Sequence, residues 1–243
     1  MGSIFIKEVN SIFSSLIGYV VIADFLLLLG LTMWVFPDYS ILNYNYATLQ
    51  QLFDIAPLIF LFLIPAITMR SFAEEQQTGT IELLATRPIP ELSIVLGKFL
   101  AGLVLVLFAL LPTLLYYWTV SSLGSPPGNI DGGAVLGSYL GLIMLACVFI
   151  AIGIFSSSLT NNQIVSFVLA IFLCFIFYWG FSFISALPGF VGTLDALVQK
   201  LGIEYHYYSI SRGLIDTRDL IYFVSLTAFF IYITQFSLER RKW

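Results

Sequence analysis

Long hydrophobic runs alternate with short polar connections along the chain, and this pattern predicts membrane-spanning helices. A helix needs about 20 mainly apolar residues to cross the hydrocarbon core of a bilayer. We expect spans at about Leu16–Phe36, Leu52–Met69, Ile94–Trp118, Ala134–Phe155, Gln163–Ile184 and Leu220–Leu238. The predicted fold class is therefore an all-α polytopic membrane protein with six transmembrane helices, organised as one domain over residues 1–243. Asp54, Pro57 and Pro65 are expected to shorten or kink the second span.

The stretch before the first span is amphipathic. Its apolar side chains recur at helical spacing, at Phe5, Val9, Ile12, Phe13 and Leu16. Most polar residues of the stretch fall on the other faces, which is the pattern of a helix that lies in the plane of the membrane surface. We therefore predict an interfacial helix over residues 3–15. The alternative is a simple helical extension of the first span.

A polar, charged segment, residues 70–92, separates the second span from the third. Ser71 is followed three residues later by Glu74, which predicts a capping box and a helix start. Gly79 interrupts this helix and Pro88 stops it. A short helix joined tightly to two spans cannot move independently of them, so we expect it to pass force between a soluble partner and the membrane. The alternative is a solvated loop without a partner.

The longest connection, residues 185–219, lies between the fifth and sixth spans and is not plainly hydrophilic. It contains apolar residues at helical spacing, followed by a tyrosine cluster: Phe190, Leu194, Leu197, Val198, Leu201, Tyr205, Tyr207 and Tyr208. Tyrosine is enriched at membrane–water interfaces. We expect short helices at the outer membrane surface here.

Composition supports the membrane assignment, and the positive charges orient the chain. Hydrophobic residues make up 59% of the sequence and charged residues 10%, with a mean hydropathy of +0.97. If the N-terminus is inside, seven of the ten Lys and Arg residues are also inside: Lys7, Arg70, Arg87, Lys98, Arg240, Arg241 and Lys242. Cytoplasmic connections carry the excess of Lys and Arg, so we expect both termini in the cytoplasm.

The sequence lacks the residues that common membrane enzymes need. Its one histidine, His206, lies outside the spans, and neither Cys147 nor Cys174 has a metal-ligand spacing, so we expect neither a metal site nor catalytic residues. A P-loop would read GxxxxGK[ST], but the Gly97-Lys98 pair is followed by Phe99 and lacks the upstream glycine. Any ATP that drives this protein is therefore bound by another subunit. No nucleic-acid partner is expected.

Two features inside the predicted spans are candidates for a function or for helix packing: an acidic residue and a pair of glycines. Asp24 lies near the middle of the first span, where an ionisable residue is a functional candidate by default. The alternative is a carboxylate hydrogen-bonded to a neighbouring helix. Gly137 and Gly141 form a small-xxx-small motif that permits close helix packing, within one subunit or between two.

Three stretches resemble the membrane subunit of type-2 ABC exporters: Glu74–Leu84 with Thr86–Pro88, Leu96–Phe99, and Ser211–Leu220. The resemblance covers nearly the whole chain. Within that family the chain is most similar to the gliding-motility-associated permeases of Bacteroidota, through Ile4–Asn10, Pro65–Glu75 and Gly128–Asp131. The copper-enzyme-maturation permeases are near relatives.

The resemblance implies a permease of the bacterial inner membrane, with a second permease copy, ATPase subunits on the cytoplasmic face that bind ATP and magnesium, and an auxiliary membrane protein with an extracytoplasmic domain. It also implies coupling to the ATPase through residues of the polar segment and of the N-terminal helix: Glu74, Glu75, Thr78, Gly79, Thr80, Ile81, Glu82, Lys7 and Glu8. Four charged residues precede the last span and either pair with one another, which we favour, or bind an outer partner: Arg212, Asp216, Arg218 and Asp219.

Three functions remain open. The first is an ATP-driven exporter permease associated with gliding motility. The second is a scaffold or mechanical module of an envelope complex that moves no molecule, because the spans offer almost no polar lining for a hydrophilic substrate. The third, an ion-coupled carrier, depends on Asp24 alone.

Overall fold

The computed structural model describes residues 2–43, 46–80, 90–188 and 194–240, and these residues form helices and connections without a strand. In chain order the elements are α1 (Gly2–Ser14), α2 (Leu16–Trp34), η1 (Ile41–Asn43), α3 (Gln50–Thr68), α4 (Arg70–Gln77), α6 (Glu91–Leu110), η2 (Leu111–Thr113), α7 (Leu114–Leu123), α8 (Gly132–Leu159), α9 (Gln163–Phe175), η3 (Ile176–Gly180), α10 (Phe181–Ser185), α11 (Asp195–Gln199), α12 (Ile203–Ile210) and α13 (Thr217–Arg240). The predicted all-α class is confirmed.

Six helical stretches of the described chain are long and apolar enough to cross a membrane, as the sequence predicted. They are Leu16–Trp34, Gln50–Gln77, Glu91–Leu123, Gly132–Leu159, Gln163–Ser185 and Thr217–Arg240. Several consist of more than one element. The third joins α6, η2 and α7, and the fifth joins α9 to α10 through η3, a five-residue π-helical segment.

The second stretch is longer than predicted. Helix α3 runs from Gln50 through Pro57 and Pro65 to Thr68, so these prolines do not shorten it. The predicted polar helix follows α3 almost without a gap, because α4 begins at Arg70, one residue after the turn at Met69. The predicted capping box is absent: the N-cap residue is Met69, and no side chain of its own segment caps the helix.

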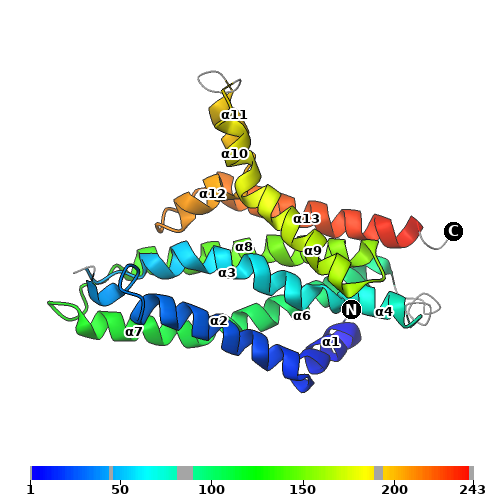
Figure 1. Ribbon diagram of the computed structural model, residues 1–243, viewed down its shortest axis with the longest axis horizontal. Coiled ribbons are helices and arrows are strands. Elements are labelled where there is room, and N and C mark those ends of the chain that lie inside the picture. Colours follow the sequence, from blue (N-terminus) through cyan, green and yellow to red (C-terminus); the bar gives the residue numbers. More distant parts are fainter. Residues whose placement is uncertain (1, 44–45, 81–89, 189–193, 241–243) are drawn as a thin grey trace.

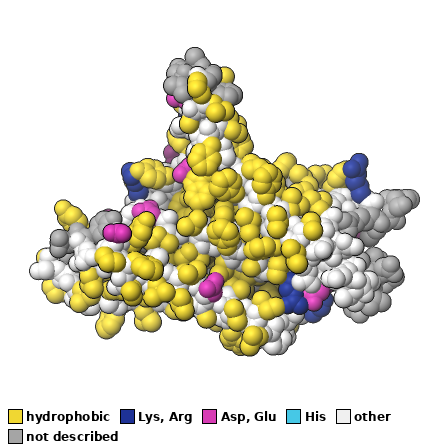
Figure 2. Space-filling model, in the orientation of Figure 1, with side chains coloured by type: hydrophobic (Ala, Val, Ile, Leu, Met, Phe, Trp, Pro, Cys, Tyr) yellow, Lys and Arg dark blue, Asp and Glu magenta, His cyan; other side chains and the backbone are white. Residues whose placement is uncertain are grey.

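Helix α8 is the central element of the bundle and packs against α3, α6, α9 and α13. Buried side chains lie all around its middle and last turns, including Leu145, Phe149 and Ile152. A helix that is apolar on every side is expected at the centre of a bundle, since each face has a neighbour to bury it. The remaining helices surround this core and leave apolar side chains on the outer surface (Figures 1 and 2).

The amphipathic N-terminal stretch forms its own helix rather than extending the first span. Helix α1 ends at Ser14, and Ser15 adopts an extended conformation before α2 begins. The chain turns so sharply that a Cβ on Gly18 would lie 2.6 Å from the carbonyl oxygen of Ile12. As a result α1 packs along α6. In Figure 1, α1, α4 and the C-terminal end of α13 lie at the same end of the bundle.

The connection between the fifth and sixth spans contains α10, α11 and α12, in agreement with the short helices predicted there. In Figure 1, α10 and α11 extend away from the bundle, whereas α12 returns to pack on α8 and α13. The Gly137–Gly141 motif serves this packing within the chain. A Cβ on Gly137 would lie 3.0 Å from Cα of Gly213, and one on Gly141 would lie 2.7 Å from Cγ2 of Ile210.

Candidate functional site

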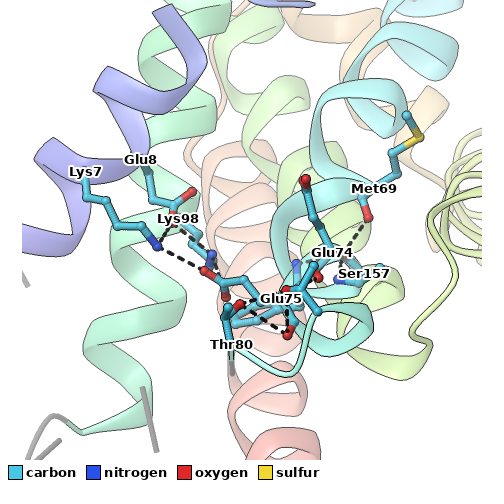
Figure 3. A network of polar contacts seen from close by, with 11 residues as sticks. Lys7, Glu8, Met69, Glu74, Glu75, Thr80, Lys98 and Ser157 are labelled. Carbon is cyan, nitrogen blue, oxygen red and sulfur yellow. Dashed lines mark hydrogen bonds and ion pairs between the residues drawn. The ribbon is translucent and has the colours of Figure 1, made fainter. Parts of the chain in front are cut away.

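Four charged side chains from three helices meet where α1, α4 and α6 converge (Figure 3). The ammonium of Lys98 on α6 lies 3.0 Å from Oε1 of Glu8 on α1 and 3.1 Å from Oε2 of Glu75 on α4. The Lys98 side chain is only 2% exposed. A buried ammonium is very costly unless carboxylates compensate it, so the position of Lys98 depends on both neighbours.

Lys7 on α1 completes this group, which we call the ion network (Lys7, Glu8, Glu75 and Lys98). Its Nζ lies 3.2 Å from Oε1 of Glu75 and 3.6 Å from Oε1 of Glu8. Burial lowers the pKa of Lys7, but the carboxylates of Glu75 and Glu8 raise it by more, so that the net pKa is above its ordinary value. Two cations therefore share two carboxylates, and the network holds no net charge.

Neighbouring residues bring the three helices close enough for these contacts. Gly97, directly before Lys98, allows α1 to approach α6: a Cβ at this position would lie 3.0 Å from Cγ2 of Ile4. On the other side, Lys98 Nζ lies 5.0 Å from the ring centre of Phe72 on α4, a favourable cation–π distance. The Gly97-Lys98 pair thus supplies a close helix contact and a buried cation.

A second junction connects α4 to α8 through Ser157 (Figure 3). The turn at Met69 separates α4 from α3, so amide groups in the first turn of α4 lack partners in their own helix. The Ser157 hydroxyl accepts hydrogen bonds from the amides of Phe72 and Ala73, at 2.9 and 3.0 Å. It also donates one to the carbonyl of Met69, at 2.9 Å. Ser157 therefore caps α4 from another helix.

Further contacts strengthen this junction. The side-chain amide of Gln76 donates to the carbonyl of Ser158, at 3.1 Å. Gly153, one turn earlier on α8, has no room for a side chain because a Cβ there would overlap the hydroxyl of Thr68. Helix α4 is thus attached to α1 and α6 by charge and to α8 by hydrogen bonds and close packing.

The outward side of α4 is available to a partner. Glu74 is 41% exposed and forms a two-pronged ion pair with Arg70, at 2.8 Å. Thr78, Gly79 and Thr80 follow it and are exposed, and Gly79 has a φ of 72°, which ends the helix. Glu75, by contrast, is only 13% exposed and points into the ion network. Of the two adjacent glutamates Glu74 and Glu75, both predicted to contact a partner, Glu74 is the more exposed.

A cavity of about 430 Å³ lies between α1, α2, α4 and α6. Charged residues of the ion network line one part of it, and apolar residues such as Ile12, Val21 and Leu105 line another. Ion pairs among these charged residues hold α1, α4 and α6 together.

The other predicted residues lie apart from the ion network. Ile81 and Glu82 fall outside the described residues. Asp24 is exposed on α2, and no hydrogen bond or ion pair joins it to any residue that the structure describes. Within the described ranges, no group of three or more His, Cys, Asp or Glu side chains could hold a metal ion.

Among the described residues, no ion pair joins the side chains of the four charged residues at the start of α13 and just before it, Arg212, Asp216, Arg218 and Asp219. Asp219 contacts Nδ1 of His206 at 2.6 Å, and Asp216 accepts a hydrogen bond from the amide of Arg218 at 2.9 Å. The guanidinium of Arg212 stacks on the ring of Tyr208, at 3.8 Å. These contacts organise the connection between α12 and α13.

Sequence reasoning missed two residues of the site, Lys98 and Ser157. Lys98 was interpreted as an inside charge and as part of the Leu96–Phe99 resemblance, and not as a member of the site, although it is a lone cation followed by an apolar run. Ser157 belongs to a run of three serines, Ser156–Ser158, at the end of α8. Only the packing of α8 against α4 shows which of the three leaves its own helix to bond another.

Comparison with known protein families gives a match over most of the chain. A family model described as "ABC-2 family transporter protein" matches residues 3–209. The matched stretch runs from α1 to α12 and includes every residue of the ion network. A comparison with curated proteins finds no match.

Proposed function

The chain belongs to the ABC-2 family of transporter proteins and is a membrane subunit of an ABC transporter; we propose that α4 receives the motion of a separate ATPase and passes it to the membrane spans. ATP and magnesium are bound by that ATPase, since this sequence contains no P-loop. The single observation that carries the proposal is the ion network, in which a buried Lys98 is held by carboxylates from both α1 and α4.

Two sets of contacts would transmit a force on α4 to the bundle: the ion network and the hydrogen bonds of Ser157. Moving α4 away from α6 would separate Glu75 from Lys98 and remove one of the two carboxylates that compensate the buried ammonium, which is unfavourable. Moving α4 away from α8 would break the hydrogen bonds of Ser157. A push on α4 is therefore expected to move α1, α6 and α8 with it rather than to bend a loop.

The ATPase would dock on the exposed surface formed by Glu74 of α4 and by Thr78, Gly79 and Thr80, which follow the helix. An exposed carboxylate can pair with a basic residue of a partner and orient it. The predicted contacts at Ile81 and Glu82 would extend this surface. Lys7 contributes from α1 through its ion pair with Glu75, and Glu8 contributes through its ion pair with Lys98.

The wider assembly is part of the same proposal. The distribution of Lys and Arg supports a multi-pass protein of the inner membrane with both termini in the cytoplasm. A second permease copy and an auxiliary membrane protein with an extracytoplasmic domain would complete the complex. The resemblance to gliding-motility-associated permeases supports a role in that process, through export or through mechanical work on the envelope.

One observation keeps the second function, a scaffold or mechanical module, in consideration. The charged groups at the ion network are engaged with one another, and the spans carry few other ionisable side chains to line a hydrophilic path. Solute-dependent stimulation of ATP hydrolysis would favour a transporter, and ATP hydrolysis that no solute changes would favour the mechanical module. An ion-coupled carrier is disfavoured because Asp24 lies on the outer surface of α2.

The proposal is tested by purifying the chain from native membranes in mild detergent and identifying the proteins that accompany it. We expect a stoichiometric P-loop ATPase. Glu74→Lys should reduce recovery of the ATPase and the coupling of its turnover to the permease, because it reverses the charge at the docking surface. Asp38→Lys is the matched control. Asp38 is also an exposed carboxylate, but it lies just after the C-terminal end of α2 and outside the proposed docking surface.

Two results would contradict the proposal. Absence of an ATPase, even after gentle crosslinking, would remove its central partner. Equal ATPase recovery and turnover with Glu74→Lys and Asp38→Lys would show that the partner docks elsewhere.

A further inference from the structure

The cavity of about 430 Å³ between α1, α2, α4 and α6 lies where three spans have their ends. Helix α2 begins at Leu16, α3 ends at Thr68, and α6 begins at Glu91. One wall is α1, whose amphipathic pattern is that of a helix in the plane of the membrane surface. The charged part of the cavity is therefore at the level of the lipid headgroups, and its volume falls in the range of small-molecule sites.

The apolar part of the cavity continues from this level into the membrane. It follows α2 along Ile17 and Val21, and α6 along Ala101 and Leu105. Residues three or four positions apart lie on the same face of a helix, so these side chains form a continuous wall that begins at Lys98. From Lys98 to Leu105 the wall is about 10 Å long, at the helical rise of about 1.5 Å per residue.

A ligand that fills both parts of the cavity must itself be amphipathic. A free anion would leave the apolar part empty, and a pure hydrocarbon would offer nothing to the charged part. A membrane phospholipid carries a charged headgroup and an acyl chain in the same order along the membrane normal. Figure 2 shows Lys or Arg and Asp or Glu side chains beside hydrophobic ones at the end of the bundle where α1 and α4 lie.

The charged part offers hydrogen-bond donors that suit a phosphate group. Arg70 donates two hydrogen bonds of 2.8 Å to Glu74, and a guanidinium has further N–H donors beyond these two. Lys7 is 60% exposed and donates to Glu75 at 3.2 Å, which engages one of the three N–H groups of its ammonium (Figure 3). The hydroxyl of Ser71 lines the same part. Charge-assisted hydrogen bonds from Arg and Lys are the usual means of binding phosphate oxygens.

The balance of charge in the cavity selects the kind of headgroup. The described lining contains as many carboxylates as cations: Lys7, Arg70, Lys98, Glu8, Glu74 and Glu75. An anionic headgroup would add an uncompensated negative charge, whereas a zwitterionic headgroup keeps the balance. Its ammonium would pair with Glu74, which is 41% exposed. Quaternary ammonium groups are recognised by aromatic cages, and the described lining contains no aromatic side chain, so a primary ammonium fits better.

We propose that the cavity binds one membrane phospholipid with a zwitterionic, primary-ammonium headgroup, as in phosphatidylethanolamine. Lys7 and Arg70 bind the phosphate, Glu74 binds the ammonium, and an acyl chain lies between Ile17 and Leu105. The lipid then contacts α1, α2, α4 and α6 together and becomes a part of their junction. This lipid site goes beyond the proposed function and uses it only for the leaflet, which the proposed orientation makes the cytoplasmic one.

Native mass spectrometry of the full chain, purified in mild detergent with the proteins that accompany it, tests the proposal. We expect one phosphatidylethanolamine for each copy of the chain after washes that remove the surrounding lipid. Rebinding to the delipidated chain is then measured with dioleoyl phosphatidylethanolamine, phosphatidylcholine and phosphatidylglycerol. Phosphatidylethanolamine should bind about five-fold more tightly than either of the others, the upper effect of one partly exposed ion pair.

Two pairs of variants locate the bound lipid. Lys7→Met should weaken rebinding of phosphatidylethanolamine about five-fold, whereas Lys200→Met, which removes an exposed lysine outside the cavity lining, should not. Ile17→Trp narrows the apolar part and should also weaken rebinding. Val20→Trp is its control, because Val20 is exposed on the same helix and does not line the cavity. Thermal unfolding checks that all four variants are folded.

Further measurements separate the headgroup from the acyl chain. Glu74→Gln should abolish the preference for phosphatidylethanolamine over phosphatidylcholine, because the primary ammonium loses its carboxylate. Glycerophosphoethanolamine and inorganic phosphate, which lack acyl chains, should not displace the lipid at equal concentration.

Each opposite result overturns the proposal. Equal binding of the three lipids would show that the retained lipid surrounds the protein without a specific site. Equal effects within either pair of variants would place the lipid elsewhere. Displacement by inorganic phosphate would make the cavity a site for free phosphate, and lipid retained only without the ATPase would make the ATPase the occupant. Rebinding is measured on the purified chain, so absence of an ATPase would contradict the proposed function without changing these results.

Discussion

The hydroxyl of Tyr207 on α12 donates a hydrogen bond of 2.6 Å to the backbone carbonyl of Phe53 on α3. The usual partner of that carbonyl would be the amide four residues later, which belongs to Pro57 and has no hydrogen. A proline within a span thus leaves an acceptor free, and a tyrosine 154 residues away satisfies it. The contact attaches the connection between the fifth and sixth spans to the second span.

Tyr207→Phe should destabilise the protein by about 1–3 kcal/mol, because the carbonyl of Phe53 remains buried without a donor. Burial raises the pKa of Tyr207 well above its ordinary value, so the hydroxyl remains a donor throughout the accessible pH range. Thermal unfolding in detergent would measure the loss. Tyr208→Phe is the control, since Tyr208 is exposed and its ring still supports Arg212.

A double substitution sharpens this prediction. Pro57→Ala restores an amide hydrogen that can bond the carbonyl of Phe53 within α3. In that background Tyr207→Phe should cost less than in the unaltered protein. Equal costs in both backgrounds would show that the hydroxyl stabilises the fold by another route.

Lys98→Met should destabilise the protein by about 3–5 kcal/mol, since Glu8 and Glu75 would lose the cation that compensates their charges. Lys7→Met should cost about 0–1 kcal/mol, because Lys7 is 60% exposed and its ion pairs are close to water. Thermal unfolding and protease sensitivity of α1 would measure both effects. Similar effects of the two substitutions would contradict the central position of Lys98.

Ser157→Ala should loosen the start of α4, because the amides of Phe72 and Ala73 lose their acceptor. Hydrogen exchange of these two amides should accelerate about 5–150-fold, the equivalent of 1–3 kcal/mol. Ser156→Ala is the matched control. Ser156 is also fully buried, but among the residues that the structure describes its hydroxyl bonds to the carbonyl of Ile152 in its own helix and to no other helix.

The same pair of variants tests the passage of motion from α4 to α8. With the ATPase bound, Ser157→Ala should uncouple ATP hydrolysis from the permease more than Ser156→Ala does. Ser157→Thr, which keeps the hydroxyl, should restore part of the coupling. If both alanine variants couple equally well, motion reaches the bundle by the ion network alone.

Gly213→Ala should be more damaging than Gly128→Ala, although both glycines have a left-handed backbone with φ of 81° and 85°. Gly128 is surrounded by open space, so its substitution costs only the backbone penalty of about 1–2 kcal/mol. A Cβ on Gly213 would also overlap the backbone of Ala134, which adds an overpacking cost of about 1–3 kcal/mol. Unfolding temperatures that fall equally for both variants would argue against the close contact of α8 with this turn.

The fold class was readable from the sequence because apolar length alone decides whether a helix can cross a bilayer. The six predicted spans agree with the observed stretches to within a few residues at most ends. The position of the start of α4 was predicted to within one residue, but its cap was predicted incorrectly. Ser71 and Glu74 have the spacing of a capping box, but Glu74 pairs with Arg70, and the cap comes from Ser157 on a different helix. Local spacing contains no information about a donor or acceptor 85 residues away.

The site was predictable in part for the same reason. Glu74, Glu75, Lys7 and Glu8 stood out because charge is rare in this chain, and each lies at or beside the junction of α1, α4 and α6. Which of these residues joins the ion network and which stays on the surface depends on the side of each helix that faces the bundle. Glu75 is largely buried and pairs with Lys98, whereas Glu74 is more exposed and pairs with Arg70, although the two are adjacent in sequence.

The sequence by itself determined that this protein is a bundle of six apolar helices with one charged segment between the second and third, because hydrophobic length and charge are local properties. The tertiary structure alone decided which polar groups satisfy one another. Lys98 joins Glu8 and Glu75, Tyr207 joins Phe53, and Asp24 joins no described residue, since each outcome depends on which helices pack together and on which face. In an apolar bundle a buried polar group is costly until it finds a partner, and that partner is chosen by packing.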